Sequence, residues 1–520
     1  MTPLVDPTIA EPRLLHHHLL ASAARLADKT ALVSGDGRHS YADVHRRALA
    51  VAAALQRRGV QRGDRVGLFL DNGIEFVAGF FGTLLAGAVV LPINPLTKDD
   101  KLAYMLSDAR ASALLTHQAL AAIWQPALDG APSVRLAFVA GAGSTDARSH
   151  HWPSEPGDNL VDPGLIDRDL AAIIYTSGST GFPKGVMLSH LNMVSAARSV
   201  GQYLGLREDD IVHCALPLAF DYGLYQVLLA FRAGATVVLE RGFAFPVKSL
   251  EVMVRERCTV FPGVPTMFSM LMALKNLASF DMSALRLMSN TAAALSEDHI
   301  RRLRALFPQA TLFSMYGLTE CKRVTFLPPE QLDIRPTSVG RGMPNEEVWL
   351  VDDEGRRLPN GSTGELVIRG SNVMLGYWEK PEETARRLKP GPLPGEMMLY
   401  SGDLFRTDDE GWLYFVARRD DIIKSRGEKV SPREVENVIH EMPAVYEVAV
   451  VGVADDVLGQ AVKAYVTLTA GAVLTEREVI RHCLARLESF MVPKHVEFVD
   501  ELPKTNTGKI RKTGLGESPV

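Results

Sequence analysis

A segment rich in glycine and hydroxyl side chains carries the first residues with evident chemistry. The segment YTSGSTGFPKG runs from Tyr175 to Gly185 and follows the apolar residues 171–174. Glycines let backbone N–H groups approach an anion closely, hydroxyls add donors, and Lys184 adds a compact positive charge. The segment therefore predicts a phosphate-binding loop. It departs from the common P-loop, which needs Ser or Thr directly after its lysine, because Gly185 follows Lys184.

The complete segment resembles the phosphate loop of the adenylate-forming superfamily, which includes acyl-CoA synthetases, adenylation enzymes of nonribosomal peptide synthesis and beetle luciferases. Further motifs extend the resemblance over nearly the whole chain, in the order MYGLTE (315–320), GELVIRGSNVMLGYWEKPEET (364–384), YSGDLF (400–405), ARRDDIIKSRGEKVSPREVE (417–436) and LPKTNTGKIRK (502–512). The resemblance implies ATP-dependent activation of a carboxylic acid to an acyl-adenylate with release of pyrophosphate. Transfer of the acyl group to a phosphopantetheine thiol would follow.

The resemblance also implies a nucleotide site. In it, Tyr316 would stack on adenine, Asp403 would accept hydrogen bonds from the ribose hydroxyls, Thr319 would contact phosphate and Glu320 would hold Mg²⁺. A ring offers its face to a base, and a carboxylate is a hard ligand suited to magnesium. The expected nucleotide-binding residues are Thr176, Ser177, Gly178, Ser179, Thr180, Gly181, Lys184, Tyr316, Asp403 and Arg418.

Three further positions follow from the C-terminal motifs of the superfamily. Lys509 matches the catalytic lysine, which would act with Thr319 and Glu320 by donating to charge that builds between the carboxylate and the α-phosphate. Asp420 matches the hinge about which a small domain rotates, and Gly427 matches a loop that lines a thiol channel.

The segment ALPLAFDYGLYQ (215–226) contains residues that bear on the identity of the acid substrate. Phe220 stands where superfamily members that activate hydrophobic acids often carry a histidine. The pair Phe220 and Asp221 instead resembles amino-acid adenylation domains, in which the aspartate binds the substrate ammonium. A buried carboxylate needs a cation. For Asp221 that cation is either a substrate amine or one of Lys322 and Arg323, which follow Glu320.

Two arrangements of these charges remain open. Asp221 binds an amine while Lys322 or Arg323 binds a second carboxylate, as in an amino diacid, or Asp221 and Arg323 neutralise each other. Ser289 begins SNTAAALS, where Thr291 and Ala292 replace a common glycine pair and add bulk, which favours a small acid.

These residues favour a stand-alone adenylation enzyme that loads an amino acid, including a β-amino acid or amino diacid, onto an acyl carrier protein in natural-product biosynthesis. Few residues follow Lys509, so the carrier is expected to be a separate molecule. The alternative is an AMP-forming acyl-CoA synthetase that uses free CoA and a non-amino acid.

Alternating strands and helices must position these residues. Strands are expected at 30–35, 65–70, 111–117, 235–240, 284–290 and 310–317, with helices at 41–60 and 297–306. Short strands with turns follow from residue 346, and the last hundred residues read as a compact α+β unit. We expect α/β plus α+β architecture: a large multi-layer domain with mixed sheets and a β-rich subdomain (1–417), a hinge (418–420) and a small mobile domain (421–520).

Composition limits the function classes. The 520 residues are 47% hydrophobic, which suits two or three soluble folding units, and the net charge of -5 without a basic run argues against nucleic-acid binding. Four scattered cysteines and the absence of an export signal indicate a reducing, cytoplasmic location. The apolar stretch 76–93 reads as a buried helix and strand rather than a membrane span. The three histidines 16–18 are expected on a solvated face rather than at a metal.

Overall fold

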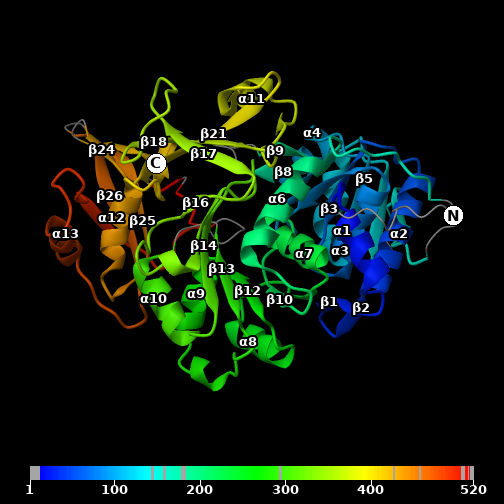
Figure 1. Ribbon diagram of the computed structural model, residues 1–520, viewed down its shortest axis with the longest axis horizontal. Helices are drawn as coiled ribbons and strands as arrows, with labels where there is room; N and C mark the ends of the chain where they lie inside the picture. Colours follow the sequence, from blue (N-terminus) through cyan, green and yellow to red (C-terminus); the bar gives the residue numbers. More distant parts are fainter. Residues whose placement is uncertain are drawn as a thin grey trace.

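The computed structural model describes residues 12–141, 146–155, 160–176, 183–291, 295–425, 428–455, 458–504, 510–512 and 514–515; within these ranges the side chains of residues 420, 424, 429 and 459 are not described. The fold is mixed α/β, with a large N-terminal domain that carries three sheets and a smaller C-terminal domain that carries a fourth. The C-terminal domain lies at the left end of the view in Figure 1, and the N-terminal domain fills the centre and the right.

The first sheet supplies most of the candidate site. Its strands, in spatial order, are β16 (Arg341–Gly342), β15 (Thr325–Leu327), β14 (Thr311–Tyr316), β13 (Leu287–Asn290), β12 (Val260–Gly263), β10 (Ile211–Cys214), β11 (Thr236–Leu239), β1 (Thr30–Ser34) and β2 (Gly37–Ser40). Strands β1, β11, β10, β12, β13 and β14 are parallel. Their carboxyl ends therefore lie along one edge, which is where open α/β sheets bind ligands.

The second sheet frames the phosphate-loop segment. Its strands, in spatial order, are β19 (Gly376–Tyr377), β9 (Lys184–Ser189), β8 (Leu170–Thr176), β4 (Val89–Ile93), β3 (Arg65–Phe69), β5 (Ala113–His117), β6 (Leu136–Ala140) and β7 (Ser149–His151). Strand β9 runs antiparallel to β8, and Thr176 pairs with Lys184 where the two strands meet the loop.

Helices pack on both of these sheets in the N-terminal domain. They are α1 (His17–Arg25), α2 (Tyr41–Arg57), α3 (Ile74–Leu85), α4 (Asp99–Asp108), α5 (Ala121–Asp129), α6 (His190–Leu204), α7 (Asp221–Ala233), α8 (Pro246–Arg255), α9 (Pro265–Met272), α10 (Glu297–Leu306) and α11 (Pro381–Arg387), with single 3₁₀ turns at Gln118–Leu120, Leu277–Ser279 and Pro329–Gln331. Gly82 of α3 lets α2 approach closely, because a Cβ there would lie 2.6 Å from Val51 Cβ.

The β-rich third sheet and the C-terminal sheet follow. The third contains β17 (Glu346–Val351), β18 (Thr363–Gly370), β21 (Met397–Thr407), β20 (Leu388–Pro390) and β22 (Leu413–Arg418). A 3₁₀ turn (Arg419–Asp421) leads to β24 (Glu428–Val430), β23 (Ile423–Ser425), β26 (Gly459–Leu468), β25 (Val445–Asp455) and β27 (His495–Phe498), with α12 (Pro432–His440) and α13 (Glu476–Leu484). This last unit has an apolar core of its own.

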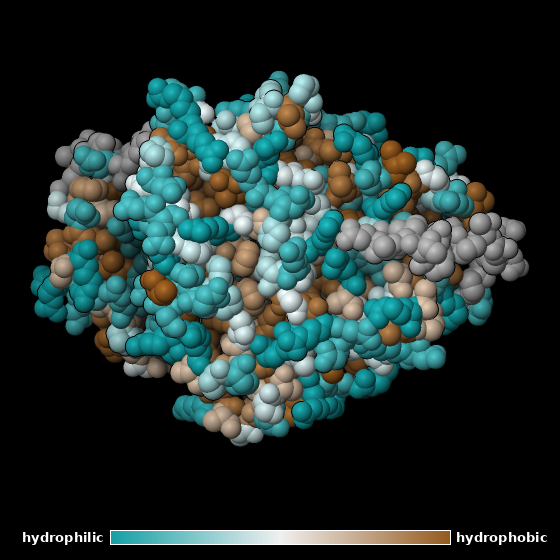
Figure 2. All heavy atoms as spheres, in the orientation of Figure 1, coloured by the Kyte–Doolittle hydropathy of each residue, from teal (hydrophilic) through white to brown (hydrophobic). Residues whose placement is uncertain are grey.

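The expected architecture is confirmed. Residues 76–93 form most of α3 and all of β4, and the predicted helix 297–306 is α10. Across the described ranges, no helix has both the length and the apolar character that a membrane crossing requires. On the face drawn in Figure 2, hydrophilic residues cover much of the surface and hydrophobic residues form small groups. All four cysteines are buried and unpaired.

The prediction of a solvated histidine face is wrong. His16, His17 and His18 are all buried, because α1 packs on α2 and α7. His18 Nδ1 donates to the Leu228 carbonyl at 3.3 Å, and His190 Nδ1 accepts from the backbone N–H of Leu15 at 3.0 Å. A neutral imidazole can be buried at modest cost when its polar atoms find partners, and the expectation of a solvated face did not take this into account.

Candidate active site

The structure brings together three of the residues assigned to the nucleotide. Tyr316 ends β14 and donates its hydroxyl to Asp403 Oδ2 at 2.6 Å, while Arg418 Nε lies 3.8 Å from Asp403 Oδ1. Asp403 and Arg418 face each other in the β21–β22 ladder. Burial raises the pKa of Asp403, and the Arg418 guanidinium and the Tyr316 hydroxyl oppose that increase. Asp403 therefore sits in a polar network at the end of the first sheet.

Thr319 and Glu320 lie in the tight turn after β14. Gly317 makes the turn possible, since a Cβ there would lie 2.1 Å from the carbonyl oxygen of Lys322. Glu320 Oε1 accepts from the Tyr377 hydroxyl at 2.8 Å, and its Oε2 has no hydrogen-bond partner among the described residues. The Thr319 carbonyl accepts from Lys322 Nζ at 3.1 Å.

The two ends of the phosphate-loop segment lie in the second sheet. Thr176 ends β8 and Lys184 begins β9. Lys184 Nζ is 2.5 Å from Glu383 Oε2 and 5.8 Å from the centroid of the Tyr377 ring. Of the other loop residues expected to bind phosphate, Ser177, Gly178, Ser179, Thr180 and Gly181 lie outside the described residues.

The residues assigned to the acid form one buried cluster. Asp221 begins α7 directly after Phe220, its N-cap residue. Arg323 Nη1 lies 3.8 Å from Asp221 Oδ2, with both side chains at least 94% buried. The Arg323 guanidinium lies 4.6 Å from the centroid of the Tyr222 ring, and the Tyr222 hydroxyl bonds Ser289 Oγ at 2.8 Å. Of the two charge arrangements left open by the sequence, the second, an internal Asp221–Arg323 pair, is present.

Lys322 is a fully buried cation beside this cluster. Its φ of 72° lies in the left-handed region that favours glycine, so the backbone turn aims its side chain inward at a conformational cost. Burial lowers the pKa of the Lys322 ammonium to about 8, although Asp221 and Glu320 act in the opposite direction.

The remaining site positions predicted from the sequence belong to the C-terminal part of the chain. Lys509 and Gly427 lie outside the described residues, and Asp420 belongs to the 3₁₀ turn Arg419–Asp421 without a described side chain. In the same region Arg419 pairs with Asp353 at 2.7 Å and with Glu365 at 2.8 Å, which ties this turn to the N-terminal domain.

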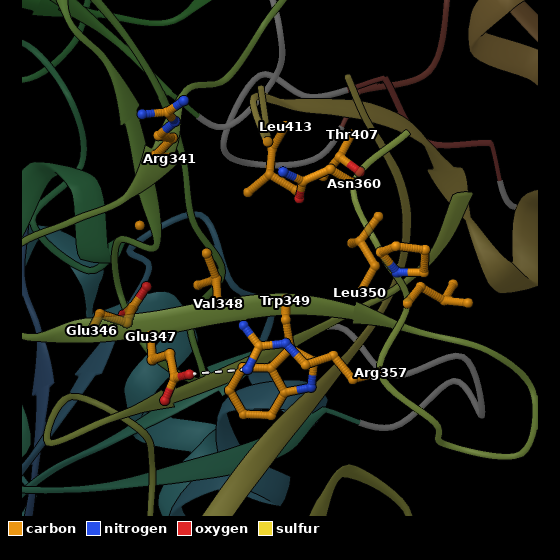
Figure 3. A pocket seen from close by; sticks show the side chains of 14 residues that line it. Arg341, Glu346, Glu347, Val348, Trp349, Leu350, Arg357, Asn360, Thr407 and Leu413 are labelled. Atoms are coloured by element: carbon orange, nitrogen blue, oxygen red, sulfur yellow. Dashed lines mark hydrogen bonds and ion pairs between the residues drawn. The ribbon is translucent and has the colours of Figure 1, made fainter. Parts of the chain in front are cut away.

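A surface pocket of about 330 Å³ lies elsewhere, on the β-rich sheet. Figure 3 shows Arg357 beside Trp349, with the guanidinium bonded to Glu347 Oε1 at 3.3 Å. None of the residues that the sequence assigned to ATP or the acid lines this pocket. We therefore locate the candidate site at the edge of the first sheet.

Two residues that contact the site were not identified from the sequence. Tyr377 and Glu383 fall in the segment 364–384, to which the sequence analysis assigned no site residue, yet they bond Glu320 and Lys184. The contacts join residues 57 and 199 positions apart, so no local spacing rule could have found them.

The side chains suit a magnesium nucleotide. Within the described ranges, no group of three or more His, Cys, Asp or Glu side chains could hold a metal ion. One carboxylate with a free oxygen fits Mg²⁺, which commonly binds one or two carboxylates and completes its shell with substrate phosphates and water. Glu320, whose Oε1 accepts from Tyr377, is the candidate for that carboxylate.

Comparison with known proteins places this geometry in a family. The model of the AMP-binding enzyme family matches residues 19–378, and that of the AMP-binding enzyme C-terminal domain matches residues 434–509. A long-chain-fatty-acid–CoA ligase of Escherichia coli O6:H1 is 33% identical over 95% of this chain and 92% of its own length. The 4-coumarate–CoA ligase 5 of Oryza sativa subsp. japonica is 31% identical over 98% and 96%.

Solved structures agree with the sequence relatives. The crystal structure of the anthranilate CoA ligase AuaEII in complex with anthranoyl-AMP superposes with a TM-score of 0.88, at 30% identity over 98% of both chains. These three relatives are named as CoA ligases, which supports the free-CoA alternative better than loading of a carrier protein. The chain belongs to the AMP-binding enzyme family and is an adenylate-forming acid–thiol ligase.

Proposed function

We propose that the protein is an AMP-forming acyl-CoA ligase that activates a carboxylic acid lacking an amino group and transfers it to free CoA. The named activities of its relatives support CoA as the acceptor. These names favour the acyl-CoA synthetase alternative over the amino-acid adenylation enzyme that the sequence motifs favoured.

One observation carries the choice of acid. The carboxylate of Asp221 has the Arg323 guanidinium 3.8 Å away, and both are buried. A buried carboxylate without a partner is costly, so a substrate ammonium would be needed only if the protein supplied no cation. Because Arg323 supplies one, an acid without an amino group fits this pocket better.

The nucleotide half of the mechanism follows from the side chains. Thr176 and Lys184 would hold the β- and γ-phosphates, and Tyr316 and Asp403 would hold adenine and ribose. Magnesium at Glu320 would supply positive charge that offsets repulsion between the anionic reactants. These groups fix ATP so that a carboxylate oxygen can attack the α-phosphorus from the side opposite the leaving pyrophosphate.

Lys509 and Gly427 are assigned to the two bond-forming steps by resemblance. Lys509 would donate hydrogen bonds to the charge shared by the carboxylate and the α-phosphate as the acyl–phosphate bond forms and pyrophosphate leaves. In the second step, the CoA sulfur, after losing its proton, forms a bond to the acyl carbon, and AMP departs with the electrons of the broken C–O bond. The Gly427 loop would line the path of the thiol.

A product assay tests this function. Purified protein is incubated with Mg·ATP, CoA and one acid from a panel of fatty, aryl, dicarboxylic, α-amino and β-amino acids, and thioesters are identified by mass spectrometry. A parallel set replaces CoA by a holo acyl carrier protein. We expect an acyl-CoA from a fatty, aryl or dicarboxylic acid, together with one AMP per thioester.

Two results would contradict the proposal. Thioester formed only on the carrier protein would make the acceptor wrong, and turnover confined to amino acids would make the acid wrong. In the second case, Asp221→Asn should abolish turnover of the amino acid, since the ammonium would lose its counter-charge.

A further inference from the structure

Tyr377 stands between two residues to which phosphate chemistry is assigned. Its hydroxyl donates to Glu320 Oε1 at 2.8 Å, and the Lys184 ammonium lies 5.8 Å from the centroid of its ring. Glu383, in the first turn of helix α11, lies 2.5 Å from the same ammonium. One short segment thus contacts both the lysine of the phosphate loop and the carboxylate after β14.

Main-chain bonds fix this segment at both ends. The Met374 N–H donates to the Glu320 carbonyl at 2.7 Å, and the Trp378 N–H donates to the Gly185 carbonyl at 2.7 Å. The Asn372 side chain donates to the carbonyl that follows Glu320, also at 2.7 Å. Because its backbone is held on each side, Tyr377 presents its hydroxyl to Glu320 from a defined direction.

The hydrogen bond from Tyr377 restricts the terminal side-chain torsion of Glu320, which would otherwise vary widely. The terminal torsion of a glutamate is broad, so an unrestrained carboxylate samples many orientations. A hydrogen bond to Oε1 fixes the carboxylate plane and leaves Oε2, which has no partner among the described residues, open to a metal ion. Hydrogen bonds to ligating carboxylates commonly change metal affinity by about 10- to 100-fold.

We propose that Tyr377 is a positioning residue that orients Glu320 for the magnesium ion of Mg·ATP. It contacts neither the acid nor the reacting atoms in this account, and it acts only through Glu320. The inference rests on the proposed role of Glu320 in the ligase reaction, and it adds a residue that the sequence motifs had left among structural positions.

The experiment compares metal-dependent with metal-free nucleotide binding. ATP is titrated calorimetrically, without acid or CoA, into wild type and Tyr377→Phe, once with excess Mg²⁺ and once with EDTA. We expect Tyr377→Phe to weaken Mg·ATP binding about tenfold and to leave metal-free ATP binding unchanged. Thermal unfolding of each variant, followed by circular dichroism, verifies that the fold is retained.

A matched control separates orientation from general support. The Tyr414 hydroxyl donates to Asp408 Oδ2 at 3.1 Å, so Tyr414→Phe removes the same kind of tyrosine–carboxylate bond outside the site. We expect this variant to bind Mg·ATP as wild type does. In a Glu320→Gln background, Tyr377→Phe should have no further effect on the magnesium dependence.

Three outcomes would overturn the inference. If Tyr377→Phe weakened ATP binding equally with Mg²⁺ and with EDTA, the hydroxyl would have a merely structural role. If Tyr377→Phe bound Mg·ATP as tightly as wild type, the hydroxyl would have no role in binding. An effect of Tyr377→Phe that persists in the Glu320→Gln background would show that the tyrosine acts through another residue. A wild-type protein that binds no ATP would instead remove the proposed function, and this inference with it.

Discussion

The charges of Arg323 and Asp221 are the main evidence for the kind of acid that the pocket accepts. Each side chain is nearly excluded from water, and their closest polar atoms are 3.8 Å apart. The Arg323 guanidinium also lies on the Tyr222 ring, and its Nη1 donates to the carbonyl oxygen of Lys322 at 3.0 Å. Removing one charge from such a pair leaves the other buried and uncompensated, which is more costly than removing both.

Variants of this pair give a prediction at the residue scale. Asp221→Asn should lower the free energy of unfolding by about 3 kcal/mol, and Arg323→Met should have a similar effect. The double variant should lose less than the sum of the two single changes, because it leaves no unpaired charge. Urea unfolding followed by tryptophan fluorescence measures these differences. Additive losses would mean that the two side chains do not depend on each other.

At the scale of elements, buried neutral histidines join helix α1 to α7, and the residues just before α1 to the start of α6. Burial lowers the pKa of His18 and of His190 to about 4 and lowers that of His16 well below its usual value. In the unfolded chain these side chains titrate near 6.5. Between about pH 6.5 and 4 the unfolded state therefore binds more protons than the folded state, so stability falls as the pH falls.

The corresponding prediction concerns His18→Gln, which keeps a donor toward the Leu228 carbonyl and does not titrate. Its free energy of unfolding should depend less steeply on pH between 6.5 and 4 than that of wild type, by up to about 1.4 kcal/mol per pH unit. Chemical unfolding across this pH range measures the slope. The exposed residue His151 provides the control, and His151→Gln should leave the slope unchanged. Identical slopes for all three proteins would contradict the account.

The helices and strands show how much of the fold could be predicted from the sequence. The hydrophobic periodicity and the flanking residues predicted helix α10 and predicted that the apolar stretch 76–93 contains a helix followed by a strand. Such elements are predictable because local hydrophobic patterning determines them. Ordered motifs predicted that Tyr316, Asp403 and Arg418 would meet. The burial of His16–His18 and the bond from Tyr377 to Glu320 arise from packing between distant segments. No local pattern encodes contacts of that kind.

At the scale of the whole molecule, we propose that the hinge 418–420 separates the domains 1–417 and 421–520. Ion pairs of Arg419 with Asp353 and Glu365 hold the first residues after β22 to the N-terminal domain. Rotation about Asp420 would then bring Lys509 to the nucleotide for adenylation and the Gly427 loop for thioester formation. The two half-reactions should therefore depend on different residues.

Acid-dependent exchange of labelled pyrophosphate into ATP, measured without CoA, tests the central claim most directly. Wild type should catalyse exchange with the acid found in the product assay, and Lys509→Ala should lower its rate by at least about 100-fold. The same variant should still convert supplied acyl-adenylate and CoA to thioester, whereas Asp420→Pro should retain exchange and lose transfer. Absence of exchange with every acid, or equal loss of both half-reactions in either variant, would contradict the account.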